Sequence, residues 1–261
     1  MKYFELETKG MRIVGEDKNY TGETSNLLHQ LISSFYEANA ALNLYIKQDD
    51  ALFEELSSPP PPPPPSLPTD EEWAEGVKER ERLASEVIEE FGIPPDDWNE
   101  IYYQVDLKSK RTKWLQGSVP RQIESAEHQI YAKAFVYAFD TIVETLKNLK
   151  EREGVSEVVA KKIEEIKEAF PDLKDVRDTS HHLGDRVVGL KVVRRQKIPI
   201  NPEGQNIVLN SHGDGTFYTM KKDGTQGSIS ITYESLEKMG QIIQDILDSF
   251  QWQGHKQHLP Y

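Results

Sequence analysis

The chain has 261 residues, of which 37% are apolar and 29% are charged, so it fits one large or two small globular domains. It contains no cysteine, which excludes disulfides and thiolate metal ligands and favours a reducing compartment. The net charge of −13 disfavours broad, nonspecific binding to nucleic acid. Because the start does not resemble a signal peptide and no run of 18 apolar residues occurs, we expect a soluble, cytoplasmic protein with no membrane partner.

The first third of the chain predicts one strong helix and one unusual linker. Residues 1–14 are compatible with a short edge strand or hairpin. Residues 26–46 predict a helix, because apolar side chains recur every three to four residues: Leu28, Leu31, Ile32, Phe35, Leu42 and Tyr45. Seven consecutive prolines at 59–65 predict a surface segment, which is either a semi-rigid spacer or a docking site for an SH3-like or WW-like partner protein. Composition favours the spacer.

A charged helix and an ambiguous segment follow the prolines. Thr69 and Glu72 form a capping box for a helix over 69–91, which Gly92 ends. In 96–117 we expect the apolar residues to pack, namely Trp98, Ile101, Tyr102, Val105 and Leu107. The basic cluster after them precedes Trp114 and suits contact with RNA, although a solvated turn is the simpler interpretation: Lys108, Lys110, Arg111 and Lys113.

The second half changes from helical to strand-like periodicity. Residues 118–149 predict the strongest helix, and shorter helices are expected at 156–170 and 172–190. After residue 190 apolar and polar residues alternate, with turn signals at 213–215 and 222–224, so we expect β-hairpins. An amphipathic helix over 233–250 and an irregular tail complete the chain.

One segment concentrates the chemistry. On a helix over 172–190, two neighbouring stripes carry arginine, histidine and aspartate: Arg177, His181 and Asp185 on one, and Asp178, His182 and Arg186 on the other. An aspartate one turn before a histidine can orient its ring, and a guanidinium can hold a phosphate. A histidine acid or base beside an arginine is what metal-free cleavage of a phosphodiester requires. A surface ladder of ion pairs is the simpler interpretation of the same spacing.

Metal and cofactor sites are not predicted. Two adjacent histidines on a helix point about 100° apart, so one cation cannot easily take both His181 and His182. The segment 212–215 lies between strand candidates and is read as a hairpin turn. No phosphate-binding glycine loop or nucleophile elbow is present.

The segment beginning at Arg177 resembles the HEPN family. The family signature is an arginine, four to six residues and a histidine on a late helix of a bundle, which Arg177 and His182 match. Asp178 stands at the polar position after the arginine, and Asp185-Arg186 resembles the continuation of some members. The resemblance covers residues 26–190, interrupted by an insert at about 57–117. It implies a mainly α fold: a HEPN-like bundle over 1–190, followed by a small α+β unit over 191–261 that packs on it.

The resemblance also implies a function. HEPN proteins are known as metal-independent endoribonucleases of antiviral defence and toxin–antitoxin systems, and some members are catalytically silent nucleotide-binding or scaffold proteins. Carried over, Arg177, Asp178 and His182 would be catalytic, while Arg186 and His181 would contact the substrate. The partners would be RNA, a second copy completing a composite site, and a partner protein or antitoxin. His181 has the better helical spacing from Arg177, so the sequence leaves both histidines open.

Overall fold

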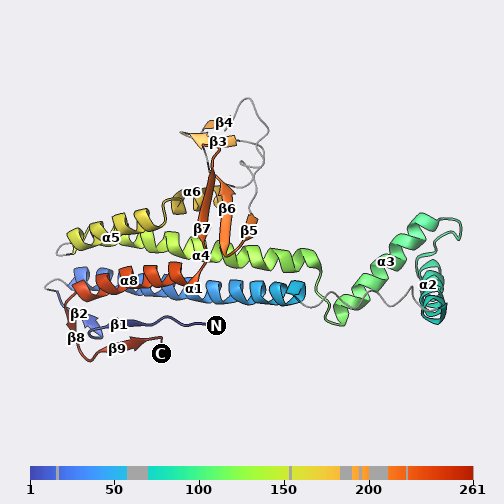
Figure 1. The fold of residues 1–261 in the computed structure, drawn as a ribbon, viewed down its shortest axis with the longest axis horizontal. Helices are drawn as coiled ribbons and strands as arrows, with labels where there is room; N and C mark the ends of the chain where they lie inside the picture. The colour runs from blue at the N-terminus through green and yellow to red at the C-terminus, as the bar shows by residue number, and fades with distance from the viewer. Residues whose placement is uncertain are drawn as a thin grey trace. The chain divides into compact units, whose positions relative to one another are not determined.

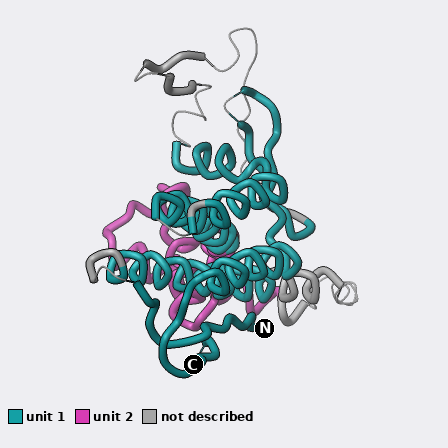
Figure 2. Tube along the Cα trace, turned by 90° about the vertical axis from the view of Figure 1, so that its left-hand side faces the viewer, with its two compact units in different colours: residues 1–49, 128–261 teal, residues 50–127 magenta. Residues whose placement is uncertain are grey.

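The computed structural model describes residues 1–15, 18–57, 70–152, 155–182, 190–193, 196–199, 211–221 and 223–260. These residues form two compact units, one of residues 1–49 with 128–261 and one of residues 50–127 (Figure 2). The fold is mainly helical with a few small antiparallel strand pairs, which confirms the predicted class at that level. The predicted insert at 57–117 falls within the second unit.

Long helices build the first unit. The described helices are α1 (Lys18–Ser57), α4 (Arg121–Lys150), α5 (Ser156–Ala169), α6 (Leu173–His181) and α8 (Tyr233–Ser249). In this unit α1, α4 and α8 lie side by side (Figure 1). The predicted helices at 26–46, 118–149, 156–170 and 233–250 are therefore confirmed, and α8 starts where the Thr232 side chain accepts a hydrogen bond from the Ser235 N–H.

The apolar stripes of these helices meet in one core. Phe35 of α1, Phe139 of α4, and Met239 of α8 are all fully buried, and the ring centroids of Phe139 and Phe135 lie 4.3 Å apart. Gly240 explains how closely α8 approaches α1, because a Cβ there would lie 3.0 Å from Cζ of Phe35. Residues far apart in sequence are thus joined, which places the C-terminal helix in the same core as the bundle.

The first unit also contains short antiparallel strands. β1 (Leu6–Thr8) pairs with β9 (Gln257–Leu259), β2 (Arg12–Ile13) with β8 (Trp252–Gln253), and β3 (Leu190–Val193) with β4 (Gln196–Pro199). A three-stranded sheet has the order β5 (Ser211–Gly213), β6 (Thr216–Met220) and β7 (Gln226–Ser230). The expected turn between β5 and β6 is present, and there Asp214 and Gly215 both have positive φ, 51° and 66°. Residues 200–210, including the strand candidate at 207–209, lie outside the described residues.

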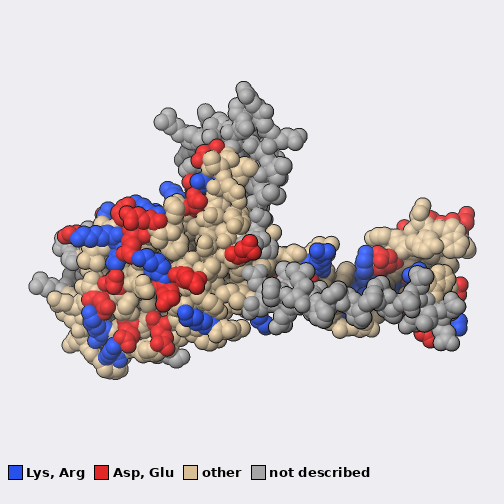
Figure 3. Space-filling model, in the orientation of Figure 1, with Lys and Arg blue, Asp and Glu red and all other residues tan. Residues whose placement is uncertain are grey.

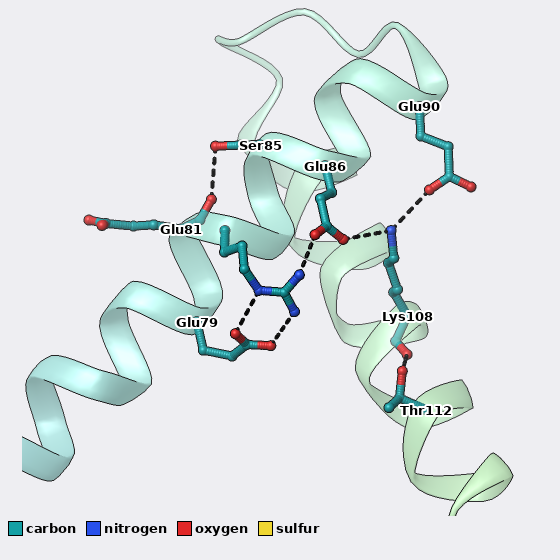
Figure 4. Close-up of polar contacts among 8 residues, drawn as sticks. Glu79, Glu81, Ser85, Glu86, Glu90, Lys108 and Thr112 are labelled. Carbon is teal, nitrogen blue, oxygen red and sulfur yellow. Dashed lines mark hydrogen bonds and ion pairs between the residues drawn. The ribbon is translucent and has the colours of Figure 1, made fainter.

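The second unit contains a helical hairpin of α2 (Asp70–Phe91) and α3 (Trp98–Leu115). Three apolar side chains are buried between them: Val87, Ile93 and Ile101. Polar contacts add to this small core (Figure 4), since Lys108 of α3 pairs with Glu86 and Glu90 of α2 at 3.0 and 3.1 Å. Within α2, Arg82 pairs with Glu79 at 2.6 Å and also with Glu86. The segment that sequence left ambiguous is therefore mostly helix.

Three expectations about these elements were wrong. The tail at 251–260 forms β8 and β9 instead of irregular structure, because strands at the N-terminus offer it partners. The helix expected over 172–190 ends at His181, and His182 forms its C-terminal cap. Residues 183–189 lie outside the described residues. Trp98 and Tyr102 were expected to pack, yet they are 61% and 67% exposed because α2 covers only the Ile101 side of α3.

The burial of Tyr36 on α1 can be tested by measuring the stability of the protein at alkaline pH. Burial raises its pKa from 10.0 to about 12. The unfolded chain loses the proton of the Tyr36 hydroxyl near pH 10, while the folded chain keeps it. The contribution of this group to stability is therefore present below pH 10 and is lost as pH rises toward 12. We expect the unfolding free energy of the wild type to fall by about 2 kcal/mol more than that of Tyr36→Phe over this range. Denaturant titrations at pH 9 and pH 11.5 measure it, and parallel pH dependence in the two proteins would contradict it.

Candidate functional site

The helix that carries Arg177 is held by the β6–β7 hairpin. At its start, the Asp172 carboxylate accepts hydrogen bonds from Lys221 Nζ at 2.9 Å and from the Ser228 N–H at 3.1 Å. Near its end, the Thr179 hydroxyl donates to the Met220 carbonyl at 2.9 Å. Gly227 of β7 permits the close approach of the hairpin to α6, since a Cβ there would lie 3.3 Å from Cγ2 of Val176. The hairpin therefore fixes α6 at both ends.

The buried face of α6 sets the direction of the polar one. Leu173, Val176 and Thr179 repeat every three residues and are buried, so they point into the core. Arg177 and Asp178 follow Val176 and flank this face, and both are only partly exposed. Local sequence periodicity thus places the guanidinium at the edge of the core, where it can reach α4.

Arg177 is held between two carboxylates. Its Nε donates to Oδ2 of Asp140 on α4 at 2.8 Å, and its Nη1 donates to Oδ1 of Asp178 at 2.7 Å. Its side chain is 26% exposed, and that of Asp140 is 12% exposed. A guanidinium has five N–H donors, and these two bonds are its only hydrogen bonds to described residues. The Nη2 group thus has no hydrogen-bond partner within the described part of the chain.

Burial and charge act against each other at this pair. Burial raises the pKa of Asp140, and the hydrogen bond and charge of Arg177 oppose the rise. Burial by itself would lower the pKa of Arg177, but the hydrogen bond that it donates to Asp140 and the charges of the neighbouring carboxylates outweigh burial and raise this pKa. Tyr137 lies one turn before Asp140 on α4. Burial raises the pKa of Tyr137, and the positive charge of Arg177 opposes this rise. Arg177 is therefore cationic at every physiological pH.

Both histidines lie at the exposed end of α6. The two rings contact edge to face, with their centroids 5.0 Å apart. His182 caps the helix by donating its backbone N–H to the Asp178 carbonyl at 3.0 Å. Among the described residues, neither imidazole forms a hydrogen bond or ion pair with Arg177 or with the Asp178 carboxylate. The structure thus joins Arg177 to Asp178 and His181 to His182, without a direct bond between the two pairs.

Some of the predicted site residues lie outside the described part of the chain. Asp185 and Arg186 lie outside the described residues, so neither predicted stripe can be followed beyond its histidine. Asp178 was expected to position both Arg177 and His182; its carboxylate accepts from Arg177 Nη1 at 2.7 Å, and the described residues show no hydrogen bond between it and His182. Of the predicted basic cluster, Lys108 binds the carboxylates of α2 and Lys110 binds Asp106 at 2.5 Å.

Sequence reasoning missed Asp140 and Tyr137. The signal was present as a lone carboxylate within the apolar stretch 134–143, on the helix with the strongest apolar face. Buried charges are found almost only where they are paired, so this aspartate called for a cationic partner. Its partner is 37 residues away in sequence, and only the packing of α6 on α4 identifies it as Arg177.

Metal ligation and membrane insertion find no support in the described part of the chain. No group of three or more histidine, aspartate or glutamate side chains there could hold a metal ion. No described helix is long and apolar enough to cross a membrane. On the face drawn in Figure 3, acidic and basic side chains are interspersed over the first unit, and no extended basic surface is visible. A phosphate-bearing ligand would therefore depend on a local contact such as Arg177.

Comparison with protein-family models gave no match, and comparisons with curated proteins and with solved structures gave none either.

Proposed function

We propose that the protein is a metal-independent endoribonuclease of the HEPN type, acting in antiviral defence or as a toxin. The observation that supports this most is the site on α6: a guanidinium fixed by Asp140 and Asp178, whose Nη2 has no partner among the described residues, one turn before two exposed imidazoles. Residues four apart on a helix are neighbours, so Arg177 and His181 share a face. His182 follows in the turn that ends the helix.

These groups suit cleavage through the 2′-hydroxyl of RNA. One histidine takes the proton from that hydroxyl, whose oxygen attacks the adjacent phosphorus. Arg177 Nη2 stabilises the charge that develops on the phosphate oxygens. The bond to the 5′-oxygen breaks, and that oxygen receives a proton from a second acid. The products are a 2′,3′-cyclic phosphate and a 5′-hydroxyl, and no metal ion or cofactor takes part.

A second candidate is a catalytically silent nucleotide-binding or scaffold protein of the same type. The observation that favours it is the charge around Arg177, where two carboxylates face one guanidinium. An incoming phosphate must overcome this local negative charge. The silent candidate predicts nucleotide binding at Arg177 without turnover.

The test is cleavage of labelled single-stranded RNA and of tRNA in EDTA. We expect the wild type to cut and His182→Ala to be slower by about 10²–10⁴-fold, the usual contribution of a general acid or base. His181→Ala is measured beside it, since both side chains are exposed and neither change disturbs the core, and the larger loss identifies the histidine that transfers the proton. Equal cutting by His182→Ala and wild type would overturn the role of His182. No cutting by the wild type, together with nucleotide binding that Arg177 governs, would favour the silent candidate.

A further inference from the structure

The α2–α3 hairpin has a core too small for the apolar side chains that it carries. Only Val87, Ile93 and Ile101 are buried there, whereas six aromatic side chains of the hairpin are between 45% and 67% exposed: Trp73, Phe91, Trp98, Tyr102, Tyr103 and Trp114. Aromatic side chains are normally largely buried, and several exposed ones on one helical hairpin are typical of an interface. We call these six residues the aromatic surface.

Helical spacing orders the aromatic surface into stripes. On α3, Trp98 and Tyr102 are one turn apart, and their ring centroids lie 6.3 Å apart in a tilted arrangement. Tyr103 and Trp114 are eleven residues apart, which is close to three full turns, so they share another stripe. On α2, Trp73 lies three turns before Ala84 and extends the stripe that packs on α3. The apolar surface therefore continues past the contact between the two helices.

The charges of the hairpin indicate what covers this surface. Residues 50–127 contain 18 acidic and eight basic residues, so they account for −10 of the net charge of −13. Such a unit repels nucleic acid. Within it α2 has nine acidic and three basic residues, whereas residues 107–115 of α3 have four basic and no acidic ones. The hairpin thus carries both an acidic helix and a basic half-helix, which complement each other between two copies.

Two of the basic side chains are available for such pairing. Lys108 and Lys110 are engaged within the hairpin, but Arg111 and Lys113 form no ion pair with another described residue. Both are exposed at the C-terminal end of α3, on the same helix as the aromatic surface. On α2, Glu81 and Glu89 are exposed carboxylates without an ion pair to a described residue. Opposite charges therefore flank the apolar stripes.

We propose that the aromatic surface binds the same surface of a second copy, with the acidic α2 of each chain against the basic end of the partner's α3. Six aromatic side chains that bury about 150–250 Å² each when covered, and are roughly half exposed here, offer on the order of 700 Å² per copy. A stable interface uses about 800 Å² per partner. Two helical hairpins combined in this way form a four-helix bundle. This pairing is independent of the RNA cleavage proposed above.

Sedimentation equilibrium of the full chain between about 0.1 and 100 μM tests the pairing, a range that covers ordinary dimer affinities. We expect a dimer for the wild type and at least a tenfold weaker dimer for Trp98→Ala with Tyr103→Ala. Ile130→Ala on α4 is the matched control, because this apolar side chain is 58% exposed but lies outside the hairpin. Arg111→Glu with Lys113→Glu removes only exposed charges and should weaken the dimer without affecting folding.

Each other outcome would overturn the proposal. A wild type that is monomeric throughout the range leaves the aromatic surface without a second copy. A dimer that all the hairpin variants retain would place the contact elsewhere. Binding of labelled single-stranded RNA by a monomer, lost in Trp114→Ala, would identify the surface as an RNA platform instead. Since the readout is mass, it stands whether or not the protein cuts RNA.

Discussion

Arg177→Ala combined with Asp140→Asn should give a folded protein that cleaves RNA about 10²–10³-fold more slowly than Asp140→Asn alone, the usual cost of losing a group that stabilises transition-state charge. The reason is the Nη2 group of Arg177, which has no partner among the described residues while Nε and Nη1 are bound, and to which the proposed mechanism assigns the charge on the phosphate oxygens. Initial rates with labelled single-stranded RNA in EDTA measure the ratio. Equal rates in the two variants would remove Arg177 from the reaction.

The double variant is needed because Arg177→Ala by itself changes stability. Asp140 is 8% exposed, and removing its partner leaves a buried carboxylate unpaired, which costs about 3–5 kcal/mol. A loss of activity in the single variant would then mix unfolding with chemistry. Asparagine at 140 removes the charge but keeps an oxygen that can accept from Arg177 Nε, so Asp140→Asn is the proper reference. Denaturant unfolding of all three variants separates the two effects.

Phe139→Ala should lower the free energy of unfolding by about 3–5 kcal/mol, the usual cost of removing a buried aromatic side chain. Phe139 is fully buried on α4, and its ring contacts Phe135 and Phe170 with centroids 4.3 and 5.2 Å away. The cavity would open between α4 and the end of α5, next to α6 and one residue before Asp140. Urea titration followed by circular dichroism measures the change.

Ile130→Ala is the control for this core prediction. Ile130 lies on the same helix, is 58% exposed and should change the unfolding free energy by less than about 0.5 kcal/mol. If Phe139→Ala cost no more than Ile130→Ala, the packing of α5 and α6 on α4 described above would be wrong. Because that packing brings Asp140 to Arg177, the result also bears on the candidate site.

The helices were largely predictable because they depend on local periodicity. Leu28, Leu31, Phe35 and Leu42 repeat every three to four residues, and this face is buried in α1. The turn at Asp214-Gly215 was equally local, since few residues adopt positive φ easily. The end of α6 was missed, because helical spacing continues in the sequence past His181 without a break that periodicity can detect.

The sequence by itself determined the helix periods, the hairpin turn at Asp214-Gly215 and the polar cluster from Arg177 to His182, because each depends on residues within a few turns. The tertiary structure decided what that cluster can reach. It paired Arg177 with Asp140 across 37 residues, turned Asp178 toward the guanidinium instead of the imidazole, and held α6 against β6 and β7. It also left Trp98 and Tyr102 exposed, because an apolar residue is buried only where another element covers it.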